Sequence, residues 1–127
     1  MADYPTDFRD PWVDDDGMLH FQLGVKRPSL TKVMQMFRNA GRLTGDGTRL
    51  LVVDARAMRL APPARVWTFA PYRLASIARA IAFLFSEMTP TEVRKFQKGV
   101  AALGIPSRVF EEGAEVEAIT WLKSFDE

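Results

Sequence analysis

Two kinds of pattern alternate along the 127-residue chain. Continuous apolar runs of strand length occur in "RLLVVD" at 49–54 and in "ARAIAFLF" at 78–85. Runs without polar interruptions are typical of strands that are covered on both faces of a parallel sheet. Elsewhere, apolar residues recur at the spacing of one helix face, as at Leu30, Val33 and Phe37. The patterns therefore predict amphipathic helices that alternate with buried strands.

The remaining segments complete the order β-β-α-β-α-β-α-β-α. Asp16-Gly17 favours a tight hairpin turn, so we expect a strand up to Val13 and a second strand over 18–23. Alternating strands and helices predict an α/β fold, with right-handed crossovers and a mostly parallel sheet of about five strands that begins with this hairpin. The other predicted elements are a helix from Leu30 to Ala40, a strand over 49–54, a short helix from Pro62 to about Phe69, a strand over 78–85, a helix from Pro90 to Leu103, a strand over 107–110 and a helix near 112–125.

Proline, threonine and glycine set the predicted ends of two helices. Pro71 would clash with the carbonyl one turn earlier, so we expect the second helix to stop before it. Thr89 is the predicted N-cap of the third helix, with Pro90 at the first helical position and Glu92 closing a capping box. Gly104 is expected to end the same helix in the left-handed conformation.

Composition limits the classes of function. We expect one domain over 11–127, preceded by a flexible tail over 1–10 whose acidic, polar sequence is unlike a signal peptide. The absence of cysteine excludes disulfides, thiolate zinc sites and cysteine nucleophiles, and is typical of a cytoplasmic protein. The net charge of +1 favours no nucleic-acid partner. The longest apolar run is too short to span a membrane.

The titratable residues near the N-terminus show no spacing that indicates a metal or catalytic site. Asp14, Asp15 and Asp16 precede Gly17, but the ligand spacing of a calcium-binding EF-hand loop does not continue after them. We interpret them as a solvated hairpin turn. His20 is the only histidine and, without a second ligand or a nucleophile at a suitable spacing, is predicted to be a half-exposed strand residue. We therefore expect no metal, no cofactor and no catalytic residue.

The order of elements, with "RLLVVDARAM" before a helix and "SRVFEEGAEVEAITWLKSF" at the end, resembles STAS-like domains. These share the SpoIIAA-like fold of anti-sigma-factor antagonists and sulfate-transporter tails. The chain looks closest to small bacterial STAS-like proteins that end in a strand, an acidic turn and a "WL" helix. The resemblance covers roughly 13–125, and it implies a regulatory or protein-interaction role without catalysis.

The resemblance also implies a switch that this sequence lacks. In the antagonists, an aspartate that ends a strand is followed, at the start of the next helix, by Asp-Ser-Ser-Gly, and one of the serines is phosphorylated. Asp54 matches the strand-end aspartate, whereas Pro62–Arg65 stands where the family has Asp-Ser-Ser-Gly. With no hydroxyl there, no phosphoester can form, so we expect the phospho-switch to be absent from this turn.

Basic residues make the turn after Asp54 a candidate binding site. Arg56, Arg59 and Arg65 lie where a strand ends and a helix begins, a position that can hold phosphate, a nucleotide or a lipid head group. Against this interpretation, Asp54 can neutralise one of the arginines.

Aromatic residues extend the candidate surface along the second helix. Trp67 and Tyr72 belong to an apolar load that a helix broken at Pro71 cannot wholly bury, which favours an exposed patch, while packing on the core is an equally good interpretation. One hypothesis is a non-enzymatic STAS-like module that forms a homodimer or binds a protein partner through the surface from Asp54 to Tyr72. The alternative is a domain that binds a small acidic, nucleotide or lipid-like ligand at the Arg-rich turn.

Overall fold

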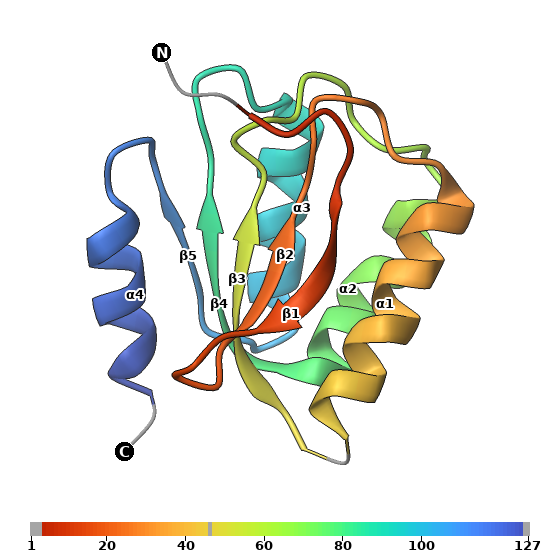
Figure 1. Ribbon diagram of the computed structural model, residues 1–127. Helices are drawn as coiled ribbons and strands as arrows, with labels where there is room; N and C mark the ends of the chain where they lie inside the picture. The colour runs from red at the N-terminus through yellow and green to blue at the C-terminus, as the bar shows by residue number, and fades with distance from the viewer. Residues whose placement is uncertain (1–3, 46, 126–127) are drawn as a thin grey trace.

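The computed structural model describes residues 4–45 and 47–125, and the elements in these ranges follow the predicted order (Figure 1). They comprise five strands and four helices, so the α/β class predicted from the hydrophobic pattern is confirmed. The strands are β1 (Arg9–Val13), β2 (Leu19–Gln22), β3 (Arg49–Asp54), β4 (Ala78–Leu84) and β5 (Ser107–Phe110). The helices are α1 (Leu30–Thr44), α2 (Val66–Ile77), α3 (Thr91–Ala102) and α4 (Glu115–Lys123).

The five strands form one mixed sheet whose spatial order, β1-β2-β3-β4-β5, repeats their order along the chain. β1 is antiparallel to β2, as the predicted hairpin requires, and each later strand is parallel to its predecessor. In the central pair, Leu51 lies opposite Ile81 and Val53 lies opposite Phe83. The two long apolar runs are therefore parallel neighbours, as their sequence predicts.

Helices cover the two faces of the sheet unequally. α1, α2 and α3 pack on one face, and α4 stands on the opposite side (Figure 1). Right-handed crossovers between strands that are added one after another place the connecting helices on one face, so only α4, which follows the last strand, can lie on the other. Leu51 and Ile81 belong to the core under the three helices, whereas Leu50 and Val52 belong to the smaller core under α4.

Pro71 lies inside α2, so the prediction that it ends the second helix is wrong. Pro71 has no amide hydrogen to donate to the carbonyl of Trp67, one turn earlier. Beyond it, however, Leu74 and Ile77 are buried against the sheet. Burial of two large aliphatic side chains contributes more than one hydrogen bond removes. Packing therefore outweighs the local preference of proline.

The third helix begins later than predicted, and Thr89 is not its cap. α3 starts after Pro90, and no side chain caps its amides. The Thr89 hydroxyl instead donates to the carbonyl of Ala55 at 3.1 Å and accepts from the amide of Ser86 at 2.9 Å. Because this hydroxyl is already engaged, the predicted capping box with Glu92 is wrong.

The ends of the last two helices lie close to their predicted positions. Gly104, with a φ of 87°, follows α3 in the left-handed conformation that was expected of it. α4 is shorter than the predicted helix because the residues after β5 first form a turn, in which the amide of Ala114 donates to the carbonyl of Glu111 at 3.1 Å. The predicted acidic turn between the strand and the helix is thus present.

Residues 4–8, called here the N-terminal strap, pack on the loop between β2 and α1. The amide of Val25 donates to the carbonyl of Pro5 at 2.9 Å, and the next amide along the loop bonds to the strap in the same way. A side chain on Gly24 would meet the carbonyl carbon of Asp7 at 2.4 Å, so only glycine permits this approach. β1 begins two residues before the predicted boundary between tail and domain.

Candidate functional site

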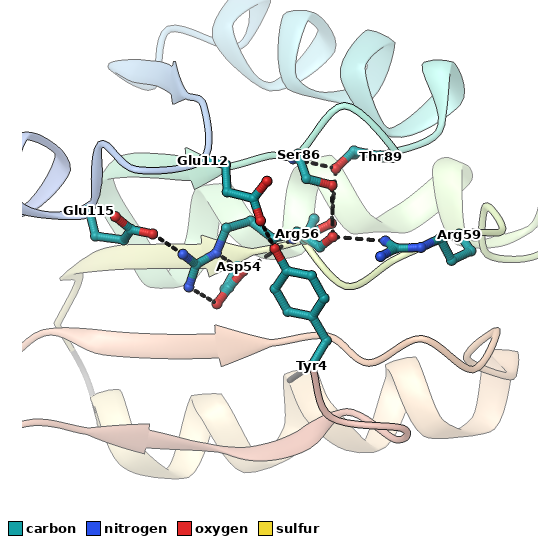
Figure 2. Close-up of polar contacts among 9 residues, drawn as sticks. Tyr4, Asp54, Arg56, Arg59, Ser86, Thr89, Glu112 and Glu115 are labelled. Carbon is teal, nitrogen blue, oxygen red and sulfur yellow. Dashed lines mark hydrogen bonds and ion pairs between the residues drawn. The ribbon is translucent and has the colours of Figure 1, made fainter. Parts of the chain in front are cut away.

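The loops that follow β3, β4 and β5 meet at the carboxyl edge of the sheet, and Arg56 lies at their centre (Figure 2). Its Nε and Nη2 atoms donate to the two carboxylate oxygens of Asp54 at 3.0 and 2.9 Å. Its Nη1 atom pairs with Glu115, the first residue of α4. Arg56 therefore joins the end of β3 to α4, and all three of its guanidinium nitrogens are engaged.

The guanidinium of Arg56 is charged in any protein environment, and this pairing favours the charged form further. The hydrogen bond to Asp54 raises the pKa of Arg56 above its ordinary value; burial opposes this change, and the charges of Asp54 and Glu115 add to it. Only 20% of the Arg56 side chain and 15% of the Asp54 side chain are exposed. Bidentate pairs of this kind are strong and directional. The pair is therefore a rigid joint and not a mobile surface contact.

Arg59 holds the loop that follows. Its Nη1 atom donates to three successive carbonyls, from Arg56 to Met58, at 2.9 to 3.0 Å. Its guanidinium carbon lies 5.6 Å from the centre of the Tyr4 ring, and the Tyr4 hydroxyl donates to Glu112. Arg59 thus fixes the backbone beneath it and, through the aromatic ring, supports the N-terminal strap.

Two hydroxyls from the loop after β4 complete the arrangement (Figure 2). Ser86 donates to the carbonyl of Arg56 at 2.9 Å and Thr89 to that of Ala55 at 3.1 Å. Their residues are 3% and 5% exposed, respectively, so these hydroxyls serve the structure and are not presented to a modifying enzyme. The name edge network is used below for Tyr4, Asp54, Arg56, Arg59, Ser86, Thr89, Glu112 and Glu115.

The structure brings together only some of the residues that the sequence singled out. Asp54, Arg56 and Arg59 belong to the edge network. Arg65 is exposed beside α2, and in the described part of the chain its guanidinium has no ion-pair partner. Tyr72 is 67% exposed on α2 and does not join the network. Because Arg56 and Arg59 direct donors to groups of the protein itself, the Arg-rich turn offers fewer free donors to an anion than its sequence implies.

Glu115, the second acidic partner of Arg56, and Glu112, the partner of Tyr4, were missed, although the sequence contains a signal for them. Glu112 and Glu115 lie in "EEGAE", directly after the last strand. The carboxyl ends of parallel strands meet at one edge, so acids after β5 and arginines after β3 are natural partners. The distance between them along the chain hides this relation. Tyr4 carries no comparable signal, since it lies in the predicted tail.

An apolar cavity of about 60 Å³ lies between the sheet and the three helices. Phe21, Val53 and Phe83 line it from the strands, and side chains of α1, α2 and α3 line its other side. Among the residues that the structure describes, its lining is wholly apolar. Met58 and Pro62, from the loop that carries Arg56 and Arg59, are part of the lining. The Arg-rich loop therefore has a charged side and an apolar side.

Beside this cavity, a surface groove of about 370 Å³ lies between α2 and α3. The groove is lined by Trp67, Pro71, Glu92, Lys95, Phe96 and Gly99. The rings of Trp67 and Phe96, whose centres are 5.1 Å apart, line both spaces. Trp67 is half-buried: it packs on Phe96 and also lines the surface groove.

A second surface hollow, of about 490 Å³, lies between β5 and α4. Its apolar part comprises Phe110, Trp121 and Val116, and 79% of Val116 is exposed. Arg108 and Glu117 lie among the polar residues that line it. Trp121 packs on Phe110, with ring centres 5.9 Å apart, so the hollow has a firm aromatic floor.

His20 lies on β2, away from the carboxyl edge, and 19% of its side chain is exposed, so it is more buried than the half-exposed strand residue that the sequence predicts. It contacts Asp14 at 2.7 Å and stacks on Trp12 with ring centres 4.8 Å apart. Burial raises the pKa of Asp14, but the hydrogen bond with His20, two backbone amides and the charge of His20 together hold this pKa below its ordinary value. Over residues 4–45 and 47–125, no three acids or histidines are grouped as metal ligands would be.

Comparisons with protein-family models, with curated proteins and with solved structures found no match to this chain. The STAS-like resemblance therefore rests on the quoted motifs and stays a prediction. In the described ranges, none of the helices has the length and apolar character needed to cross a bilayer.

Proposed function

We propose that this chain is a non-enzymatic, STAS-like interaction module that pairs with a second copy of itself at the free edge of β5. The hollow between β5 and α4 carries this proposal, because it combines an exposed apolar side chain, Val116, with an unpaired strand edge. Exposed apolar hollows beside open strand edges are typical of interaction sites.

The edge network supports a structural rather than a chemical role for the Arg-rich turn. Asp54, Arg56 and Glu115 satisfy one another, and Ser86 and Thr89 are buried with their hydroxyls bonded to carbonyls. A catalytic or phospho-acceptor group needs an accessible reactive atom. We therefore expect no phosphate on residues 62–65 or on these two hydroxyls in protein isolated from its own cells, as intact-mass and peptide spectra would establish.

The two edges of the sheet differ in how they resist pairing with another chain. β1 contains Pro11, and its register with β2 shifts between Arg9 and Trp12. Proline and irregular register are common protections against edge-to-edge association. β5 contains no proline and keeps a regular register with β4 from Ser107 to Phe110. The β5 edge is therefore the one suited to adding a strand.

Charges beside the hollow fit a twofold partner. Arg108 and Glu117 are both exposed and both line it. In a twofold dimer each surface meets its own copy, so Arg108 can face Glu117 of the second copy, and the reverse pair forms by symmetry. The apolar area around Val116 would then be covered between two such pairs.

Native mass spectrometry and light scattering of the full chain test the proposal. The wild type is expected to be a dimer, and Val116→Asp is expected to weaken it by at least about tenfold, because a charge is buried at the contact. Arg108→Glu should weaken it through facing carboxylates, and adding Glu117→Arg should restore it. Tyr72→Asp, also at an exposed apolar residue, is the matched control.

A monomeric wild type at high concentration would overturn the proposal. Dissociation by Tyr72→Asp but not by Val116→Asp would instead place the interface on the predicted surface from Asp54 to Tyr72. The alternative ligand at the Arg-rich turn is tested by thermal shift with nucleotides and phosphate, where Arg65→Glu should abolish any stabilisation that depends on this turn.

A further inference from the structure

We propose that the apolar cavity and the α2–α3 groove form one binding site for an alkyl chain with a single carboxylate. In this arrangement the last carbons of the chain occupy the cavity, the chain passes between Trp67 and Phe96, and the carboxylate lies near Lys95. This site goes beyond the proposed self-association and uses a different surface from the hollow at β5.

The cavity suits the end of a hydrocarbon chain. Its lining in the described chain is apolar throughout, and apolar cavities stay dry and take up small apolar molecules. Its volume of about 60 Å³ is well below the roughly 150 Å³ of an engineered cavity that binds benzene. The cavity can therefore hold only a few carbons, and the rest of a longer ligand must lie outside it.

The position of the cavity favours a ligand site over a simple packing defect. Leu23 and Met58, from the loops that follow β2 and β3, lie in its lining, so the cavity reaches the carboxyl ends of parallel strands. Loops at the carboxyl ends of parallel strands are common binding sites in α/β proteins, and this cavity lies beneath the three helices on one face of the sheet.

Trp67 and Phe96 form the only wall that the cavity and the groove share among the described lining residues. Both are half-buried. In the described part of the chain the indole nitrogen of Trp67 makes no hydrogen bond, so its ring can turn without breaking one. Turning either ring connects the two spaces.

The groove supplies room for the chain and a charge for its head. An added Cβ at Gly99 would meet nothing within 4 Å, so this glycine leaves the groove open. Lys95 lines the groove and has no ion-pair partner among the described residues. Glu92 lies on the same rim and would repel a doubly charged head group. A single carboxylate beside Lys95 is therefore the best match.

Fluorescence of Trp67 tests the site directly. With Trp12→Phe and Trp121→Phe, Trp67 is the remaining tryptophan, and sodium hexanoate, octanoate and decanoate serve as probes. Each probe is expected to change the emission of Trp67 in a saturable way. Affinity should rise about fourfold for each added methylene until the cavity and groove are filled. No change with any probe would overturn the proposal.

Paired variants of α3 locate the bound chain. Gly99→Leu should reduce decanoate affinity by at least about tenfold by filling the groove, whereas Ala101→Leu, exposed on the same helix, should leave it unchanged. Glycine and alanine are both replaced by a good helix former, so both variants are expected to fold. Equal affinity in the two variants would place the binding elsewhere and overturn the site.

Removing the charge of Lys95 tests whether this side chain binds the carboxylate of the ligand. Lys95→Met should weaken decanoate several-fold and leave decanol unaffected, and Lys98→Met should affect neither probe. Equal loss of decanoate and decanol affinity in Lys95→Met would overturn the role of the carboxylate. Val116→Asp should bind decanoate and decanol with the same affinities as the wild type. This result would separate the site from the proposed dimer contact.

Discussion

The surroundings of the loop between β3 and α2 differ on its two sides in how completely the neighbouring groups contact it. On one side, Arg56 and Arg59 enter the edge network, in which charged groups and carbonyls satisfy one another. On the other side, Met58 and Pro62 line an apolar cavity that the surrounding side chains leave partly empty. A single short loop thus joins a constrained polar region of the fold to an incompletely packed apolar one.

The difference shows how one loop can be both fixed and adaptable. Polar groups in a partly buried network require specific partners, so removing one group leaves the others unsatisfied. Apolar walls have no directional requirement, and a change of volume there is compensated by small movements of neighbours. The charged side therefore positions the loop, while the apolar side retains room for a ligand or an added methyl group.

The largest loss of stability is expected when the charged side of the loop between β3 and α2 loses Arg56. Arg56→Met leaves Asp54 and Glu115 without their partner in a partly buried site, and should lower the free energy of unfolding by about 3 kcal/mol. Urea denaturation followed by circular dichroism measures this loss. Arg65→Met, at an exposed arginine outside the network, should change stability by no more than about 0.5 kcal/mol. Similar losses for both variants would show that the network does not hold the fold.

A smaller effect is expected where the N-terminal strap meets the network. Gly24→Ala forces a methyl group against the backbone of Asp7, so the strap must move and the hydrogen bond from Val25 to Pro5 is lost. We expect a loss of about 2 kcal/mol and faster hydrogen exchange at the Val25 amide. Gly47→Ala, where an added Cβ meets nothing within 4 Å, is the control. Unchanged exchange at Val25 would contradict the close packing of the strap.

On the apolar side of the loop, a substitution that adds volume is expected to raise the free energy of unfolding instead of lowering it. Val93→Ile adds a methyl group to the cavity wall and should raise the free energy of unfolding by about 0.5–1 kcal/mol. Val100→Ile, on the same helix but outside the cavity lining, adds the same group to a fully buried position and should be destabilising. Urea denaturation of the two variants measures the difference. Destabilisation by both would mean that the cavity cannot accept added volume.

The smallest effect concerns a charged pair away from the loop. Because the pKa of Asp14 is lower in the folded chain than in the unfolded one, ionised Asp14 stabilises the fold above the unfolded pKa. This contribution is lost as the pH falls through the folded pKa. It should amount to less than about 1 kcal/mol, since the pair with His20 is partly exposed. Asp14→Asn should therefore flatten the acid limb of the stability profile, and an unchanged limb would contradict the pairing.

Much of the fold could be predicted because its signals are local. Residues 50–53 and 80–84 are apolar without interruption, and they form the buried parts of the parallel strands β3 and β4. The wrong predictions concern residues whose environment is set by distant segments. Pro71 stays in a helix because the sheet buries the residues beyond it, and Thr89 is drawn to the carbonyl of Ala55 instead of the helix that follows.

The candidate site was predicted only in part for the same reason. Asp54 and Arg56 are two residues apart, so their pairing could be inferred from the sequence as a neutralised arginine. The pairing of Arg56 with Glu115 depends on the order of strands and on α4 standing on the opposite face. The cavity depends on the combined shape of three helices, which no single segment encodes.

The identical order of strands along the chain and across the sheet has a consequence for synthesis. Each new strand finds its neighbour already made, so the sheet can grow one strand at a time as the chain leaves the ribosome. The β5–α4 unit arrives last; within the sheet it pairs with β4 alone, and the contacts of Glu115 with Arg56 and of Glu112 with Tyr4 hold it in place. Its departure would uncover the edge of β4, the most hydrophobic strand, and nascent or partly opened chains are therefore most prone to aggregate there.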